Sequence, residues 1–179
     1  MAIAAPAVAV NAAFLQEIKE DAQDLHELLE CTVVLLTGPS WVRAQPRRLV
    51  QLLEQIRDQL ALHFSLEEVY GYCDAAADGD PRHAAQAAAL RSQHQELYRQ
   101  ICDLVEAAQQ VLYHEAPTAG PDRLAVGFAA LVDELHDHEV HENEMIAEAF
   151  DDDSRASGRS LVPGGLQQAV WQSGPPPGE

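Results

Sequence analysis

Three clusters of glycine and proline divide the sequence into four long segments that carry the apolar spacing of amphipathic helices. The clusters lie at 37–40, 77–81 and 117–121, and clusters of this kind end one helix and start the next. Within each segment apolar residues recur at steps of three and four, the spacing of one buried helix face. Four helices with short connections predict an all-α, antiparallel up-down-up-down four-helix bundle. We expect its helices over about 11–37, 46–76, 82–115 and 121–150.

The chain has 179 residues, about the length of one domain. We place the bundle in residues 1–150 and expect 151–179, which is rich in Ser, Gly, Gln and Pro, to be a disordered tail. The net charge of −18 disfavours binding to nucleic acid or to an anionic membrane surface. No segment has the roughly 18 continuous apolar residues of a membrane-spanning helix. Three cysteines without a CxxC motif fit a reducing compartment, so we expect a cytoplasmic protein.

One histidine interrupts the apolar stripe of each expected helix, and two of the stripes also carry a glutamate four residues later. The spacing of four places each of these His–Glu pairs on one helix face, about one turn apart. Counting residues from the turns puts the histidines of the last three helices at about the same height, and that of the first helix fits less well. The six residues are His26, His63, Glu67, His94, His138 and Glu142.

Metal ions explain why such residues would lie in a bundle core. An ionised carboxylate is costly there unless something compensates its charge, and a pair of metal ions would neutralise both glutamates and bind the imidazoles. A closed zinc site needs only four ligands, whereas six ligands of mixed imidazole and carboxylate type suit two ions of iron or manganese. A ferritin-like site would require Glu-x-x-His on two helices, and the sequence contains no such motif.

The order of these motifs resembles that of hemerythrin-like (HHE cation-binding) domains. His26, the run from His63 to Glu67, His94 and the run from His138 to Glu142 carry the resemblance, which covers about 11–150. It is closest to the subgroup with the arrangement His, HxxxE, His, HxxxE. The resemblance implies an up-down bundle that holds two iron ions with a bridging oxo or hydroxo oxygen, manganese or zinc being less favoured. The implied metal ligands are His26, His63, Glu67, His94, His138 and Glu142.

The sequence departs from the oxygen-carrying hemerythrins at two motif positions. Tyr98 stands where their third helix has a second histidine, and Asn143 where their last helix has an acid, with Glu142 one residue earlier. The resemblance then implies a site that is more open to water and peroxide, or one that Tyr98 or His141 completes. Tyr70 is one turn after Glu67, where it could bond a carboxylate or a bound oxygen species, or be an ordinary core aromatic.

Together these features predict a non-haem di-iron protein that binds dioxygen or a related small oxidant such as peroxide. Its role would be sensing, storage or peroxide decomposition. Whether it is an enzyme stays open, and an enzyme of this kind would be a di-iron catalase or peroxidase. The alternative is an iron-responsive regulatory module, in which metal orders the bundle and a protein partner binds its surface or the tail near Trp171. A metal-free acidic bundle that serves as an interaction domain is the third hypothesis.

Overall fold

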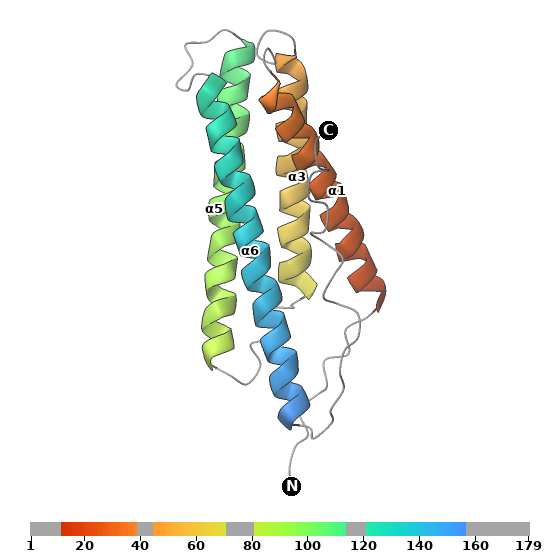
Figure 1. Ribbon diagram of the computed structural model, residues 1–179. Helices are drawn as coiled ribbons and strands as arrows, with labels where there is room; N and C mark the ends of the chain where they lie inside the picture. Colours follow the sequence, from red (N-terminus) through yellow and green to blue (C-terminus); the bar gives the residue numbers. More distant parts are fainter. Residues whose placement is uncertain (1–11, 39–44, 71–80, 114–120, 157–179) are drawn as a thin grey trace, which may run out of the picture.

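The computed structural model describes residues 12–38, 45–70, 81–113 and 121–156, which form four long helices (Figure 1). Helix α1 spans Ala12–Thr37, α3 Pro46–Tyr70, α5 Pro81–Leu112 and α6 Pro121–Ala156. Successive helices run in opposite directions, and this confirms the predicted all-α up-down-up-down bundle. None of the described helices contains an apolar stretch that could cross a membrane.

The helix boundaries follow the proline positions. Pro46, Pro81 and Pro121 each begin a helix, where the missing N–H of proline costs nothing because it would have no partner in the helix. Helix α6 ends at Ala156 instead of the expected 150, because no glycine or proline occurs between 151 and 157 to stop it. The expected helix ends at 76 and 115, and 157–179 of the expected tail, lie outside the described residues.

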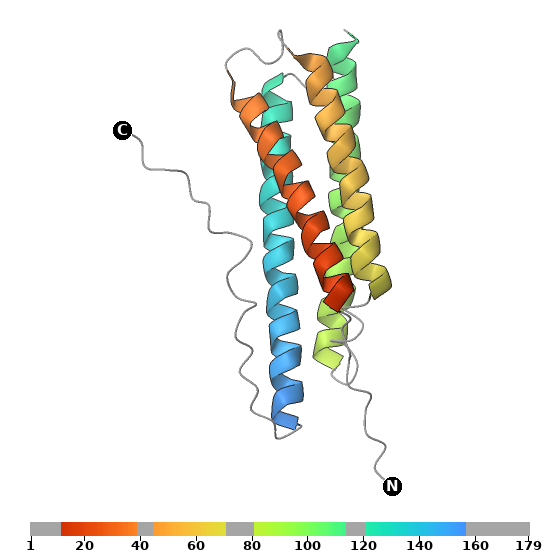
Figure 2. The same cartoon turned by 90° about the vertical axis from the view of Figure 1, so that its right-hand side faces the viewer.

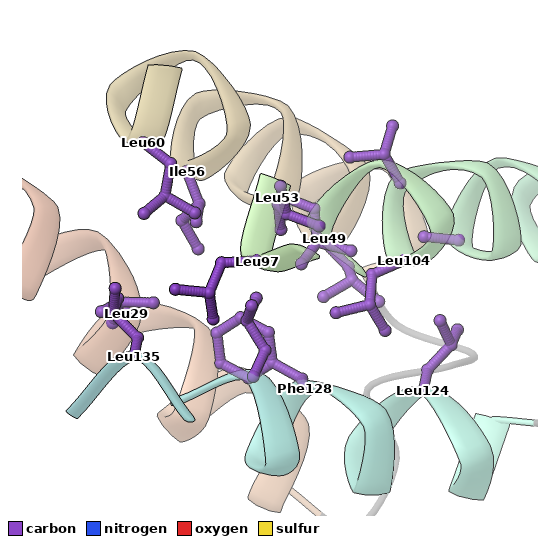
Figure 3. Close-up of a cluster of buried hydrophobic side chains, with 14 of the residues drawn as sticks. Leu29, Leu49, Leu53, Ile56, Leu60, Leu97, Leu104, Leu124, Phe128 and Leu135 are labelled. Carbon is purple, nitrogen blue, oxygen red and sulfur yellow. The ribbon is translucent and has the colours of Figure 1, made fainter. Parts of the chain in front are cut away.

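Leucine, isoleucine and phenylalanine side chains from all four helices form one large apolar core. Ile56, Leu60, Ile101, Phe128 and Leu131 are each at most 1% exposed. Figure 3 shows the labelled side chains of this core pointing toward one another from α1, α3, α5 and α6. Their burial provides the main stabilisation of a bundle of this kind.

A layer of polar side chains separates this large core from a second, smaller apolar group. The smaller group consists of Ala87, Leu90 and Met145. Along α5, His94 lies between Leu90 of the small group and Leu97 of the large core. The layer is therefore enclosed by apolar side chains on both sides along the bundle axis. We call it the polar layer, and its members are described below.

The buried stripes predicted for α3, α5 and α6 are confirmed at every position whose side chain is described. For α1, the apolar spacing predicts a buried stripe whose described members are Ala22, His26, Leu29, Val33 and Leu36. This prediction is wrong at three positions: Ala22 and His26 are only half-buried, and Val33 is exposed. Adjacent leucines at 28–29 and 35–36 allow two neighbouring faces of α1 to serve as the apolar face, so the pattern alone could not choose between them. The buried face of α1 consists of Asp21, Leu25, Leu29, Thr32 and Leu36.

Helix α1 packs mainly against α3 and only lightly against α6. In Figure 2 it crosses the bundle obliquely in front of the other helices. Its position near the polar layer therefore depends on contacts with α3, and these include the polar contacts described in the next section.

Replacing Phe128 by alanine should lower the free energy of unfolding of the metal-free chain by about 3–5 kcal/mol, because the ring is fully buried and leaves a cavity. Val126→Ala is the matched control, since Val126 is on the same helix and is 70% exposed. It should change the free energy by less than about 0.5 kcal/mol. Urea unfolding followed by circular dichroism measures both, and equal effects of the two substitutions would contradict this description of the core.

Candidate metal centre

The polar layer consists of buried side chains contributed by all four helices. Each of them is at most 9% exposed, and each contacts or closely approaches another member. Five of them belong to the predicted ligand set, and one, on α1, does not. The six residues are Asp21 of α1, His63 and Glu67 of α3, His94 of α5, and His138 and Glu142 of α6.

The carboxylate of Glu67 lies at the centre of the layer, between two sets of imidazole nitrogens. Its Oε1 is 2.9 Å from His63 Nε2 on the same helix. Its Oε2 is 3.2 Å from His94 Nε2 on α5, and this nitrogen is in turn 3.1 Å from His138 Nε2 on α6. One oxygen of Glu67 therefore faces a single histidine, while the other faces a pair.

All three imidazoles are held by their outer nitrogen, so that their inner nitrogen points into the layer. His63 Nδ1 is 2.9 Å from Asp21 Oδ2, His94 Nδ1 is 3.2 Å from Glu68 Oε1, and His138 Nδ1 is 2.9 Å from Gln93 Oε1. Oxygen acceptors at Nδ1 require a hydrogen on that nitrogen. In a neutral ring the lone pair is then on Nε2, which is the arrangement found in metal-binding histidines.

The ring of Phe64 closes the layer on the side of the large core. It stacks on the His94 imidazole with ring centres 4.2 Å apart and planes 8° from parallel. It also meets the His138 imidazole edge-on, with centres 5.9 Å apart. Phe64 is 5% exposed, so it both fixes the two imidazole planes and keeps water from this side of the layer.

In the absence of metal, a proton on His63 compensates the charge of the Glu67 carboxylate. Burial by itself lowers the pKa of His63, but its hydrogen bonds to Asp21 and Glu67 outweigh this and raise the pKa to about 10. Burial by itself raises the pKa of Glu67, but the imidazoles of His63 and His94 lower it to about 2. At neutral pH the metal-free layer therefore contains a His63 imidazolium beside an ionised Glu67.

Two further groups of the layer are uncharged at neutral pH. Burial and the nearby negative charge of Glu67 raise the pKa of Glu142 to about 8. Burial, and secondarily the neighbouring imidazole of His94, lower the pKa of His138 to about 4. A metal ion would find the Nε2 lone pair of His138 free of a proton, whereas His63 and Glu142 must each release a proton in order to bind it.

The side chains of the layer fit a metal centre by three tests. Two nitrogens about 2.1 Å from one ion and at right angles would lie about 3.0 Å apart, and His94 Nε2 and His138 Nε2 are 3.1 Å apart. Glu67, His94 and His138 offer ligand atoms that all lie within 4.8 Å of one another, and the described residues contain no other such group of three. Glu67 Oε2 is buried and has no hydrogen bond of normal geometry within the described part of the chain.

His26 lies apart from this group. It is half-buried on the flank of α1, and its Nε2 is 3.0 Å from Glu30 Oε1. Together with His136 and Glu139 these residues line one part of a cavity of about 300 Å³ between α1 and α6, whose remaining walls are mostly apolar. Burial raises the pKa of Glu139, which lies near both His26 and His63.

Two of the three additional candidates from the sequence, Tyr98 and His141, lie outside the layer. The side chain of Tyr98 is 38% exposed on α5, and His141 is exposed on α6. The side chain of Tyr70 lies outside the part of the chain whose side chains are described.

Sequence reasoning missed Asp21, Phe64, Glu68 and Gln93. Asp21 was detectable, because it precedes Leu25 by four residues on the stripe that is in fact buried. Glu68 and Gln93 each directly adjoin a residue of the layer in sequence. Their role depends on side-chain contacts across helices, and helical periodicity carries no signal for these.

Glu142→Gln should make the metal-free chain more stable above pH 7, while it weakens metal binding. The pKa of Glu142 is raised from its ordinary value of 4.5 to about 8 in the folded state. The folded chain therefore loses stability relative to the unfolded chain as the pH rises from 4.5 to about 8. Glutamine has no proton to lose, and at pH 8.5 we expect a gain of about 1–3 kcal/mol.

Urea unfolding of the metal-free chain between pH 5 and 9 measures this effect. Glu144→Gln is the matched control, since Glu144 is an exposed carboxylate on the same helix. A Glu142→Gln variant that is less stable than the wild type at pH 8.5 would contradict the assigned environment of Glu142.

A comparison with protein families agrees with this geometry. The family model described as the hemerythrin HHE cation binding domain matches residues 12–150. No curated protein and no solved structure shows a significant match to this chain. The matched range begins with α1 and includes every residue of the polar layer, and it confirms the resemblance at the level of the family, whereas the subgroup stays a prediction. The chain therefore belongs to the hemerythrin HHE cation-binding domain family.

Proposed function

We propose that this chain binds two iron ions through the carboxylate of Glu67 and the imidazoles around it, and that these ions would bind dioxygen or a related small oxidant. The observation that carries the proposal is the position of the Glu67 carboxylate, with one oxygen toward His63 and the other toward His94 and His138. A carboxylate that faces nitrogen ligands in two directions is suited to bridge two cations.

The composition of the layer disfavours a thiolate-ligated metal, and the proposed redox role favours iron over zinc. Imidazole with carboxylate, and without any thiolate, suits iron, manganese or zinc. Of the cysteines among the described residues, Cys31 is exposed and Cys102 is half-buried at the level of the large core, and neither is a member of the polar layer. Two iron ions would supply reversible one-electron redox chemistry, which zinc lacks.

The protein would restrict access to the metals and control the protons around them. Leu60, Phe64, Leu97 and Leu135 border the layer in the large core, and such walls admit small uncharged molecules more readily than anions. Glu142, whose pKa is about 8 beside Glu67, can hold or release a proton at its carboxyl oxygen near neutral pH. These properties suit a small oxidant such as dioxygen or hydrogen peroxide.

Iron loading under anaerobic conditions should give about two iron ions per chain, and admitting dioxygen or hydrogen peroxide should change the visible absorption spectrum. Glu67→Gln should bind less iron and lose the spectral change, because a neutral amide cannot bridge two cations. Asp58→Asn is the control, since Asp58 is an exposed carboxylate on the same helix. A wild-type chain that binds iron and gives no spectral change with either oxidant would contradict the oxidant-binding function.

An iron-responsive regulatory role is the second candidate. It is favoured by the pairing of Glu67 and Glu142, two buried carboxylates that repel each other when both are ionised. Metal ions would relieve this repulsion and draw the helices together, so that occupancy of the site alters the shape or mobility of the bundle.

Hydrogen exchange tests this second role. Metal-loaded chain should show at least about tenfold slower amide exchange than metal-free chain in the segments of α3 and α6 around the layer, because ligands from different helices are then tied to one centre. The buried segment around Ile101 serves as an internal reference. Identical exchange rates in the two forms would contradict a role that depends on ordering by metal.

A further inference from the structure

Asp21 is a buried carboxylate of the polar layer that is not among the predicted metal ligands. It lies on the face of α1 that packs against α3, and it is 6% exposed. Both of its oxygens bind α3: Oδ2 is 2.9 Å from His63 Nδ1, and Oδ1 accepts a hydrogen bond of 2.6 Å from Gln59 Nε2. Gln59 thus fixes the orientation of the carboxylate that holds His63.

This arrangement determines which nitrogen of His63 is directed at the metal centre. A carboxylate only accepts hydrogen bonds, so Nδ1 of His63 carries a hydrogen. Nε2 then becomes the atom that can offer a lone pair, and it lies 2.9 Å from Glu67 Oε1. We propose that Asp21 is a positioning residue that selects this tautomer of His63 and directs its Nε2 to the metal on that side of Glu67. The inference rests on the proposed function only in assuming that a metal ion binds there.

The anchor at His63 differs from the anchors of the other two imidazoles. Glu68, which holds His94, is 51% exposed, and Gln93, which holds His138, is also exposed. Water can replace an exposed hydrogen-bond partner at little cost, whereas it cannot readily enter the buried contact between Asp21 and His63. Loss of the Asp21 carboxylate should therefore affect its histidine most strongly.

Asp21 also connects the metal centre to α1. Within the described part of α1, the other buried polar side chain is Thr32, which bonds back to the carbonyl of Leu28 on its own helix. Asp21 joins α1 directly to an imidazole of the layer, that of His63, and α1 packs only lightly on α6. A metal ion that immobilises His63 therefore also favours the docked position of α1.

Zinc binding to the full-length chain provides the test, with the variant Asp21→Asn and the control Asp24→Asn. Asparagine keeps the shape of the side chain, but its amide group can donate to Nδ1 and so favour the opposite tautomer. Asp24 is an exposed carboxylate on the same helix, so its substitution makes the same change in charge. We expect Asp21→Asn to weaken by about 10–100-fold the zinc-binding step that involves His63, and Asp24→Asn to stay within about twofold of the wild type.

Nitrogen-15 spectra of the histidine side chains give a readout that a purely structural role would not change. In zinc-loaded wild type, His63 should show a protonated Nδ1 and a metal-bound Nε2, and in Asp21→Asn it should show a mixture of forms. Gln59→Leu, which frees one oxygen of Asp21, should weaken the same step by at least about twofold. This second variant decides the question if Asp21→Asn does not fold.

Three results would overturn the proposal. The first is a wild-type His63 signal that zinc does not alter. The second is an unchanged His63 tautomer and zinc affinity in Asp21→Asn, even if its metal-free form is less stable. The third, should Asp21→Asn not fold, is a Gln59→Leu variant with wild-type zinc affinity. Because zinc undergoes no redox chemistry, the zinc test does not depend on a reaction with an oxidant. A chain that binds zinc through His63, but whose iron-loaded form gives no spectral change with dioxygen or hydrogen peroxide, would contradict the proposed function and leave the role of Asp21 standing.

Discussion

The buried carboxylate of Glu67 constrains the whole of the polar layer, because an ionised group that is 3% exposed must be neutralised by its surroundings. Imidazoles from three helices approach its two oxygens directly or through one another. In the metal-free chain the neutralising charge is a proton on His63. Cations would replace that proton and also allow Glu142 to ionise, so the layer is better matched to metal than to protons.

The layer lies between two apolar groups of side chains, and this strengthens the requirement that the charge of Glu67 be compensated. The large core adjoins it at Leu97 and Phe64, and the small group adjoins it at Leu90 and Met145. Because water is largely excluded, charge interactions inside the layer are stronger than at the surface, and so is the penalty for leaving any of its groups without a partner. The apolar residues of the bundle thus stabilise the fold, whereas burial of the polar layer destabilises it. Metal binding can compensate this cost.

The sequence predicted the bundle and most of the layer because both follow from helical periodicity. His63, Glu67, His94, His138 and Glu142 lie on strongly apolar stripes, so their burial could be expected from spacing alone. Helix α1 was predicted less well, since its adjacent leucines fit two faces equally. Contacts across helices decide which face is buried, and the bonds from Asp21 to Gln59 and His63 belong to this class. The contacts of Glu68 with His94 and of Gln93 with His138 likewise cannot be predicted from helical periodicity.

Three His–Glu pairs at a spacing of four occur in this chain, and the structure gives them different environments. His63 with Glu67 and His138 with Glu142 are buried, whereas the side chains of His26 and Glu30 are 33% and 62% exposed. The carboxylate of Glu30 is largely solvated, so this ion pair contributes little to stability. A buried pair requires either a proton or a metal ion, and its neighbours decide which of the two it holds. The environment of an HxxxE motif therefore depends on whether it lies on a buried face of its helix. The spacing of four by itself only places the two side chains on the same face.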